Sequence, residues 1–209
     1  MSVSIITVAN LGTKTNLKTP DILPVIETFA QHGELAQVMC QINTNFDFPN
    51  TYSTIPTLVR YPLRVLEKFS GLSFGRAYRL LSDYFVEKRL QRADVTFFHP
   101  PTRFEGAMRK AKQHGSIVVG IATVAHPRFD EKIHTEEHRR FGSSFSVEGF
   151  ESMSVLVAQF DYIIAISDFV KSSYVEHGFP PEKIFVAYTD TPLPLAPEYK
   201  RKSNTFKVL

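Results

Sequence analysis

The sequence has 209 residues but only one cysteine, Cys40, so the chain cannot form an internal disulfide and a reducing compartment is expected. It has no apolar run near the roughly 20 residues that cross a bilayer, and no basic segment that would begin a signal peptide. The excess of positive charge is also small, because the chain has 24 Lys and Arg and 21 Asp and Glu. The net charge of +3 does not by itself indicate that the protein binds nucleic acid. With 43% hydrophobic residues, we expect a globular, soluble, cytoplasmic protein.

Several ligand motifs are missing as well. There is no G-x-G-x-x-G and no G-x-x-x-x-G-K-[ST], so neither a dinucleotide site nor a phosphate loop is supported. No nucleic-acid-binding motif is present, and we expect no nucleic-acid partner. Cys40 lies in a predicted strand and is interpreted as a small core residue.

One motif formally indicates zinc. Residues 134–138 match H-x-x-E-H, which would place His134 and His138 on one helix face. The flanking residues are charged and no third ligand is evident, so we interpret the segment as a solvated loop and expect no metal.

Short apolar runs alternate with helical patterns along the chain. The predicted strands are residues 4–9, 35–42, 95–98, 117–122, 161–166 and 184–187. The predicted helices are residues 21–31, two within 58–92, 103–114, 148–159 and 168–176, while 43–56 and 123–142 are expected to be irregular. This alternation predicts one Rossmann-like, three-layer α/β/α domain with a mostly parallel sheet over residues 1–188. The Pro-rich residues 189–205 are expected to be a linker.

Ligands of such sheets bind where the strands end. The residues that follow predicted strands are Asn10, Gly12, His99, His126 and Ser167. Gly12 could let a ligand approach the backbone or simply form a tight turn. His126 could bind a hydroxyl or exchange a proton, or it could be satisfied by loop carbonyls. His99 could form a structural corner with the prolines after it, and Ser167 is expected to cap a helix.

Positive charge is concentrated in residues 57–92, which carry eight basic and three acidic residues. Arg60, Arg64 and Lys68 are spaced by four, so they line one face of a predicted helix. Such a helix could lie on an anionic membrane surface. The alternative is an ordinary helix pair whose apolar side packs on the sheet.

A more specific pattern occurs in four segments, residues 92–99, 118–126, 161–171 and 177–186. It consists of acidic residues, apolar strands, histidines and a lysine that follow one another in a fixed order along the chain. Their order and spacing resemble the acceptor-side half of family 4 glycosyltransferases, which have the GT-B fold. Residues 206–209 resemble the opening of the second, donor-binding domain of that fold.

The resemblance implies a retaining transfer of a sugar from a nucleotide-sugar donor to an acceptor hydroxyl. His126 maps to a cleft histidine with a catalytic role, and Gly12 and Ser167 map to positions on the acceptor side of the cleft. We add Asn10, Lys14 and His99 as candidate substrate-binding residues.

No cofactor is implied beyond the donor, which the second domain would hold, in cis or in trans. The isolated chain is therefore expected to be inactive. The alternative is a non-catalytic binding module that docks on a membrane or a partner subunit through residues 57–92.

Overall fold

The computed structural model describes residues 1–8, 10–12, 22–44, 48, 50–71, 73–142 and 149–188. Lys14, the predicted linker at 189–205 and the predicted start of a second domain at 206–209 lie outside these residues.

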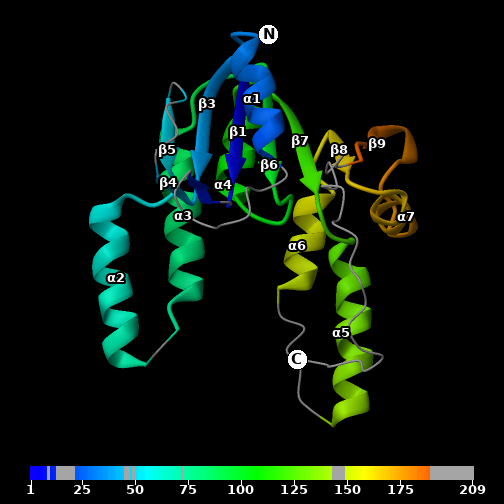
Figure 1. Cartoon of the computed structure of the whole chain (residues 1–209). Helices are drawn as coiled ribbons and strands as arrows, with labels where there is room; N and C mark the ends of the chain where they lie inside the picture. The colour runs from blue at the N-terminus through cyan, green and yellow to red at the C-terminus, as the bar shows by residue number, and fades with distance from the viewer. Residues whose placement is uncertain are drawn as a thin grey trace, which may run out of the picture.

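Seven strands among the described residues form one sheet, in which every neighbouring pair is parallel. In spatial order they are β5 (Thr51–Ser53), β3 (Leu35–Cys40), β1 (Val3–Thr7), β6 (Val95–His99), β7 (Ile117–Ala122), β8 (Tyr162–Ala165) and β9 (Ile184–Val186). The order runs outward from β1 on one side and restarts at β6 on the other. The predicted Rossmann-like α/β fold is confirmed, and its sheet is entirely parallel (Figure 1).

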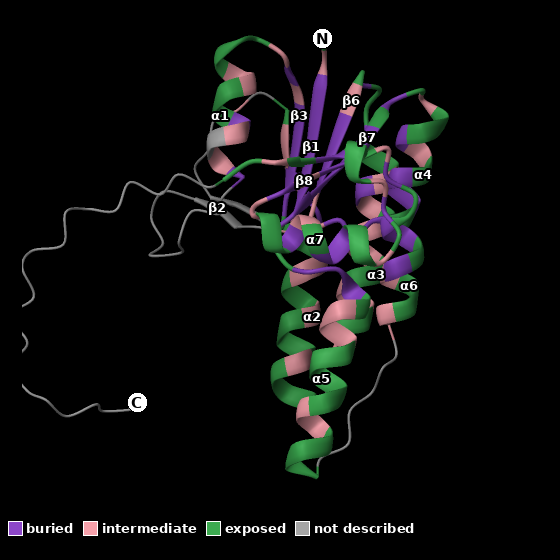
Figure 2. Ribbon diagram, turned by 90° about the vertical axis from the view of Figure 1, so that its right-hand side faces the viewer, coloured by how far each residue is buried: buried purple, intermediate pink, exposed green. Residues whose placement is uncertain are grey.

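Helices lie on both faces of this sheet and also extend past its carboxyl edge (Figure 1). They are α1 (Leu23–Gln31), α2 (Thr57–Ser70), α3 (Gly75–Arg89), α4 (Glu105–Gln113), α5 (Pro127–Phe141), α6 (Phe150–Val157) and α7 (Asp168–Glu176). One buried cluster joins α3, α4, α6 and α7 to the sheet, and a smaller one joins α1 to the opposite face. The strands are therefore the most buried part of the molecule (Figure 2).

The expectation that residues 123–142 are irregular is wrong, because most of them form α5. His126 caps this helix, Pro127 begins it, and Gly142 ends it in a left-handed conformation. Its charged residues hid it from a search for apolar periodicity, since most of the helix extends into solvent (Figure 2).

The irregular segment predicted at 43–56 also contains strand structure. Beside β5, Ile42–Thr44 form β4, which pairs in parallel with β2 (Asn10–Gly12). Strands of three residues are too short to show a period, and their pairing partners stabilise them instead.

Side-chain hydrogen bonds tie α3 to its neighbours. The buried Gln37 of β3 donates to the Arg89 carbonyl (3.0 Å) and accepts from the Gln91 N–H (3.1 Å). The Asp83 carboxylate accepts the N–H groups of Gly106 and Ala107 at the start of α4 (3.1 and 3.3 Å). These contacts fix α3 beside the sheet, and Figure 1 shows α2 and α3 extending past the carboxyl ends of the strands.

Gly120, in the middle of β7, provides a test of this packing. A Cβ placed there would lie 2.8 Å from both the Pro101 Cβ and the Ile163 Cδ1. Gly120→Ala is therefore expected to lower the free energy of unfolding by about 1–3 kcal/mol, as overpacking does, in urea denaturation. Gly75→Ala is the control, because its Cβ would meet only the Ser73 Oγ, at 3.7 Å. Equal stability of the two variants would contradict the close packing at Gly120.

Candidate functional site

The strand order reverses between β1 and β6, and their ends meet at this switch point. Thr7 ends β1 and is paired in register with His99, which ends β6. The Thr7 Oγ1 and the His99 Nδ1 are 3.0 Å apart, within hydrogen-bond distance. The sequence-predicted His99 thus lies at the crevice position where open parallel sheets bind ligands.

A cavity of about 280 Å³ lies beside this point, and we call it the arginine pocket. Four arginines line it: Arg60, Arg64, Arg79 and Arg103. Val8, Gln41 and Thr54, which follow the ends of β1, β3 and β5, line it as well. The pocket therefore occupies the carboxyl edge of the sheet, on the α2–α3 side.

Short contacts hold its walls in place. The Arg60 Nη1 donates to the Gln41 carbonyl (3.3 Å), which ties α2 to the end of β3. The Glu67 Oε1 accepts the Phe74 N–H (3.2 Å), which ties α2 to the start of α3. Glu67 also lines the pocket, so its carboxylate adds a negative charge to the wall and holds α2 against the start of α3.

The arginines of the pocket are not neutralised by neighbouring acids. Among the described residues, no carboxylate lies within ion-pair distance of Arg64, Arg79 or Arg103. Burial, together with the nearby Arg79 guanidinium, lowers the pKa of Arg103. Among the described residues, these two cations are thus held near each other without an ion-pair partner, an arrangement that an anionic ligand would stabilise.

The sequence located part of this site. Arg60 and Arg64 were predicted on an outward basic face with Lys68, but the structure turns them into the pocket, and Lys68 does not line it. Arg79 and Arg103 were missed. Arg103 lies four residues beyond the end of β6, so the rule that ligands bind at strand ends could have found it.

His126 is buried, with only 4% of its surface exposed. The Nδ1 atom of its ring accepts a hydrogen bond from the Arg128 backbone N–H (3.2 Å). The backbone N–H of His126 donates to the Ser173 Oγ (3.0 Å). Its ring stacks on that of His177 at 4.7 Å and meets the edge of Tyr174 at 5.2 Å. Burial first, then His177 and Arg128, lower the pKa of His126 to about 4.

The imidazole of His126 is therefore neutral at pH 7. Because Nδ1 accepts a hydrogen bond, the proton lies on Nε2, and this nitrogen is a hydrogen-bond donor. His126 lines a second cavity of about 350 Å³ with His177, Arg128 and Lys183. The described linings of the two cavities share no residue, so the structure does not bring His126 into the arginine pocket.

The remaining predicted site residues have mainly structural positions. Asn10 and Gly12 lie in β2, which pairs with β4, and the residues that follow Gly12 lie outside the described ranges. The Ser167 Oγ accepts the Val170 N–H (3.2 Å), which confirms the predicted cap of α7.

Two polar residues of the segment 161–171 also form structural hydrogen bonds. The Asp161 Oδ2 accepts the Val118 N–H (2.8 Å) and the Lys171 Nζ donates to the Ile184 carbonyl (3.0 Å). Cys40 is buried, as predicted.

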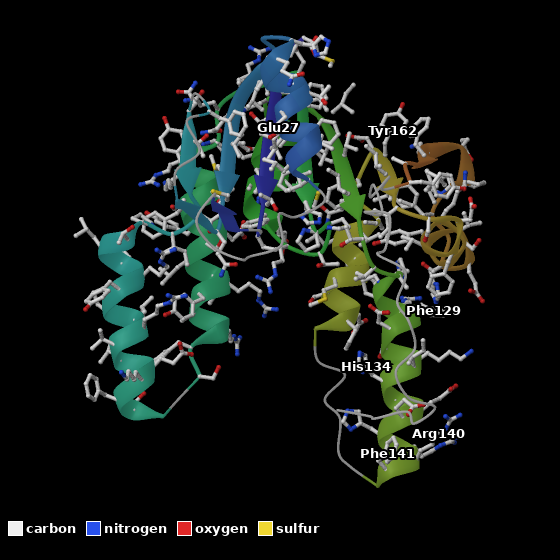
Figure 3. All side chains as sticks on the ribbon, viewed as in Figure 1. Glu27, Phe129, His134, Arg140, Phe141 and Tyr162 are labelled. Atoms are coloured by element: carbon white, nitrogen blue, oxygen red, sulfur yellow. The ribbon has the colours of Figure 1, made fainter. Side chains whose placement is uncertain are left out.

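The H-x-x-E-H segment lies on α5, so His134 and His138 do share a helix side, and Figure 3 shows His134 on the shaft of this helix. Glu137 forms an ion pair with Arg140 (2.9 Å). Within the described ranges, no three His, Cys, Asp or Glu residues are grouped so that they could hold a metal ion. None of the helices there is long and apolar enough to span a bilayer.

Comparison with models of known protein families finds no match to this sequence. A comparison with curated proteins finds no significant match either.

The low pKa of His126 predicts a loss of stability in acid. Between pH 6.5 and about 4 the unfolded chain binds a proton that the folded His126 does not, so the folded state loses stability as the pH falls through this window. His126→Asn keeps a helix cap but does not titrate, so its free energy of unfolding should fall less over the same window. Urea denaturation at each pH measures the difference, and an NMR midpoint for His126 near 6.5 would contradict it.

Proposed function

We propose that this chain is the acceptor-binding half of a retaining glycosyltransferase, which moves a sugar from a nucleotide-sugar donor to an acceptor hydroxyl. One observation carries the proposal: the segments that resemble family 4 glycosyltransferases contain strands that are neighbours in the sheet, and these parallel strands end at one edge of it. His99 ends β6, His126 follows β7 and Ser167 follows β8, and these three strands are adjacent. This is the edge at which a parallel sheet binds its ligand.

In this proposal the chain contributes position rather than covalent chemistry. It holds the acceptor hydroxyl toward the anomeric carbon of the donor sugar, which lowers the entropic part of the barrier. The neutral His126 donates a hydrogen bond from Nε2 to a hydroxyl of the acceptor or the sugar. A donor-binding half, in cis or in trans, would hold the nucleotide and stabilise the departing diphosphate.

A second function is supported by a different observation on α2. None of its fourteen residues is buried, and apolar side chains follow one another along its outer side. These are Leu58, Tyr61, Val65, Leu66 and Phe69, of which Leu58 is 89% and Phe69 83% exposed. Arg60 and Arg64 lie on the other side of the helix, in the arginine pocket.

An apolar stripe that faces solvent, with Lys68 beside it, suits the surface of an anionic membrane. We propose that α2 docks the chain on such a surface, with the stripe rather than Arg60 and Arg64 in contact with lipid. The two functions are compatible, since an acceptor in a membrane would be reached from its surface.

The transferase proposal is tested by sugar transfer from a panel of radiolabelled UDP- and GDP-sugars. The purified chain alone should transfer nothing, whereas a complex captured from its source cells through a tag on this chain should transfer sugar. His126→Asn should lower kcat/KM of that complex by about a hundredfold, because it keeps the helix cap and removes the Nε2 donor.

His134→Ala, on the exposed side of α5, is the matched control and should leave transfer unchanged. Sugar transfer by the purified chain alone would contradict the proposal that a separate donor-binding half is required. Absence of transfer by the complex over the whole panel would contradict the function itself.

The membrane proposal is tested by flotation with vesicles of phosphatidylcholine and phosphatidylglycerol at low salt. The chain should float with the vesicles, and Leu58→Ser/Phe69→Ser should remain at the bottom, because it removes apolar area that would enter the lipid. Phe185→Ser is the control, since Phe185 is 56% exposed on β9, at the opposite edge of the sheet from β5. Failure of the unmodified chain to float, or equal loss in the control, would overturn the proposal.

A further inference from the structure

The four arginines of the arginine pocket come from three separate parts of the fold. Arg60 and Arg64 lie one turn apart on α2, Arg79 lies on α3, and Arg103 lies in the loop between β6 and α4. Their convergence is thus a product of the tertiary structure and not of one basic stretch. α2 turns this basic side toward the protein while its apolar side faces solvent.

The acids near these arginines have other partners. The Glu67 carboxylate accepts the Phe74 N–H, and the Asp83 carboxylate accepts two N–H groups of α4. Asp83 and Glu105 line a neighbouring cavity that Arg79 and Arg103 also border, and neither acid is within ion-pair distance of them. Within the described lining of the pocket, four arginines therefore face a single carboxylate, that of Glu67, so the pocket keeps a net positive charge and none of its arginines is ion-paired.

We propose that the arginine pocket binds a phosphate-bearing ligand. Guanidinium groups form paired hydrogen bonds with phosphate oxygens, and several of them together can neutralise a dianion. Thr54, Ser82 and Gln41 supply uncharged polar groups in the same walls, and a volume of about 280 Å³ has room for a phosphate and part of the molecule it is attached to.

Tyr78 adds a further feature to this wall. Its hydroxyl is buried and, in the described part of the chain, makes no hydrogen bond, although Tyr78 lines the pocket. Buried hydroxyls are normally satisfied, so an additional polar group at this site is expected when it is occupied.

Phosphate binding by the pocket does not depend on the transferase activity. We also infer that this phosphate is part of the sugar acceptor, and this second step rests on the proposed function. The ligand is then either a soluble phosphate ester or a phospholipid headgroup, and both present the same phosphate group to the arginines.

Binding is measured on the full chain without any donor, so its outcome is separate from that of sugar transfer. The soluble probes are inorganic pyrophosphate and glycerol 3-phosphate, followed by calorimetry and by the melting temperature, which a bound ligand raises. Arg79→Gln and Arg103→Gln should each weaken binding about tenfold or more, since each removes a charge-assisted hydrogen bond. In phosphate-free buffer neither variant should lower the melting temperature, because neither arginine has an ion-pair partner among the described residues.

Arg76→Gln is the matched control, because Arg76 lies on α3 like Arg79 but does not line the pocket, so the variant loses the same charge outside the site. It should change binding by less than about twofold. The lipid arm uses vesicles containing phosphatidic acid, with the same three variants.

Loss of binding in the Arg79 and Arg103 variants, with either the soluble probes or the vesicles, supports the proposal and identifies the source of the phosphate. Absence of binding in both arms would overturn it. Equal weakening by Arg76→Gln would also overturn it, because the attraction would then come from the general surface charge.

Discussion

Every strand of the main sheet runs in the same direction, so all of them end at the same edge and each connection must cross a face of the sheet. This constraint places the residues after β1, β3, β5, β6 and β7 near one another, although they are far apart in the chain. The strand order reverses between β1 and β6, where Thr7 and His99 meet. The arginine pocket lies at the reversal, whereas the described lining of the cavity beside His126 consists mainly of residues that precede β8 and β9.

Helix α2 shows how a local pattern acquires a different meaning in the fold. An amphipathic helix at the surface of a globular protein normally buries its apolar side. Here Arg60 is tied to the Gln41 carbonyl and Glu67 to the start of α3, so the polar side faces the protein. The apolar side is left in water, which lowers the stability of the isolated molecule and creates a surface suited to lipid. One orientation of the helix therefore underlies both the proposed phosphate site and the membrane proposal.

In the proposed function, His126 has both a structural and a chemical role. Its Nδ1 caps α5, and the ring is enclosed by Tyr174 and His177. The cap determines which nitrogen carries the proton, and burial keeps the ring neutral. The hydrogen bond that stabilises the start of α5 therefore also leaves Nε2 as the protonated nitrogen of the ring. Ser167, in contrast, has its oxygen occupied by the cap of α7.

The sequence alone was sufficient for most of the regular structure. Strands such as Ile117–Ala122 are continuous apolar runs, and Ser167 and Gly178 mark the limits of α7, so local chemistry determines them. It was insufficient for α5, which has no apolar stripe, and for β5, which is too short to show a period. The arginine pocket could not be predicted in full, because Arg60, Arg79 and Arg103 meet only after the chain crosses from one half of the sheet to the other. Periodicity reports which side of a helix is basic, and only tertiary packing decides whether that side faces water, lipid or a pocket.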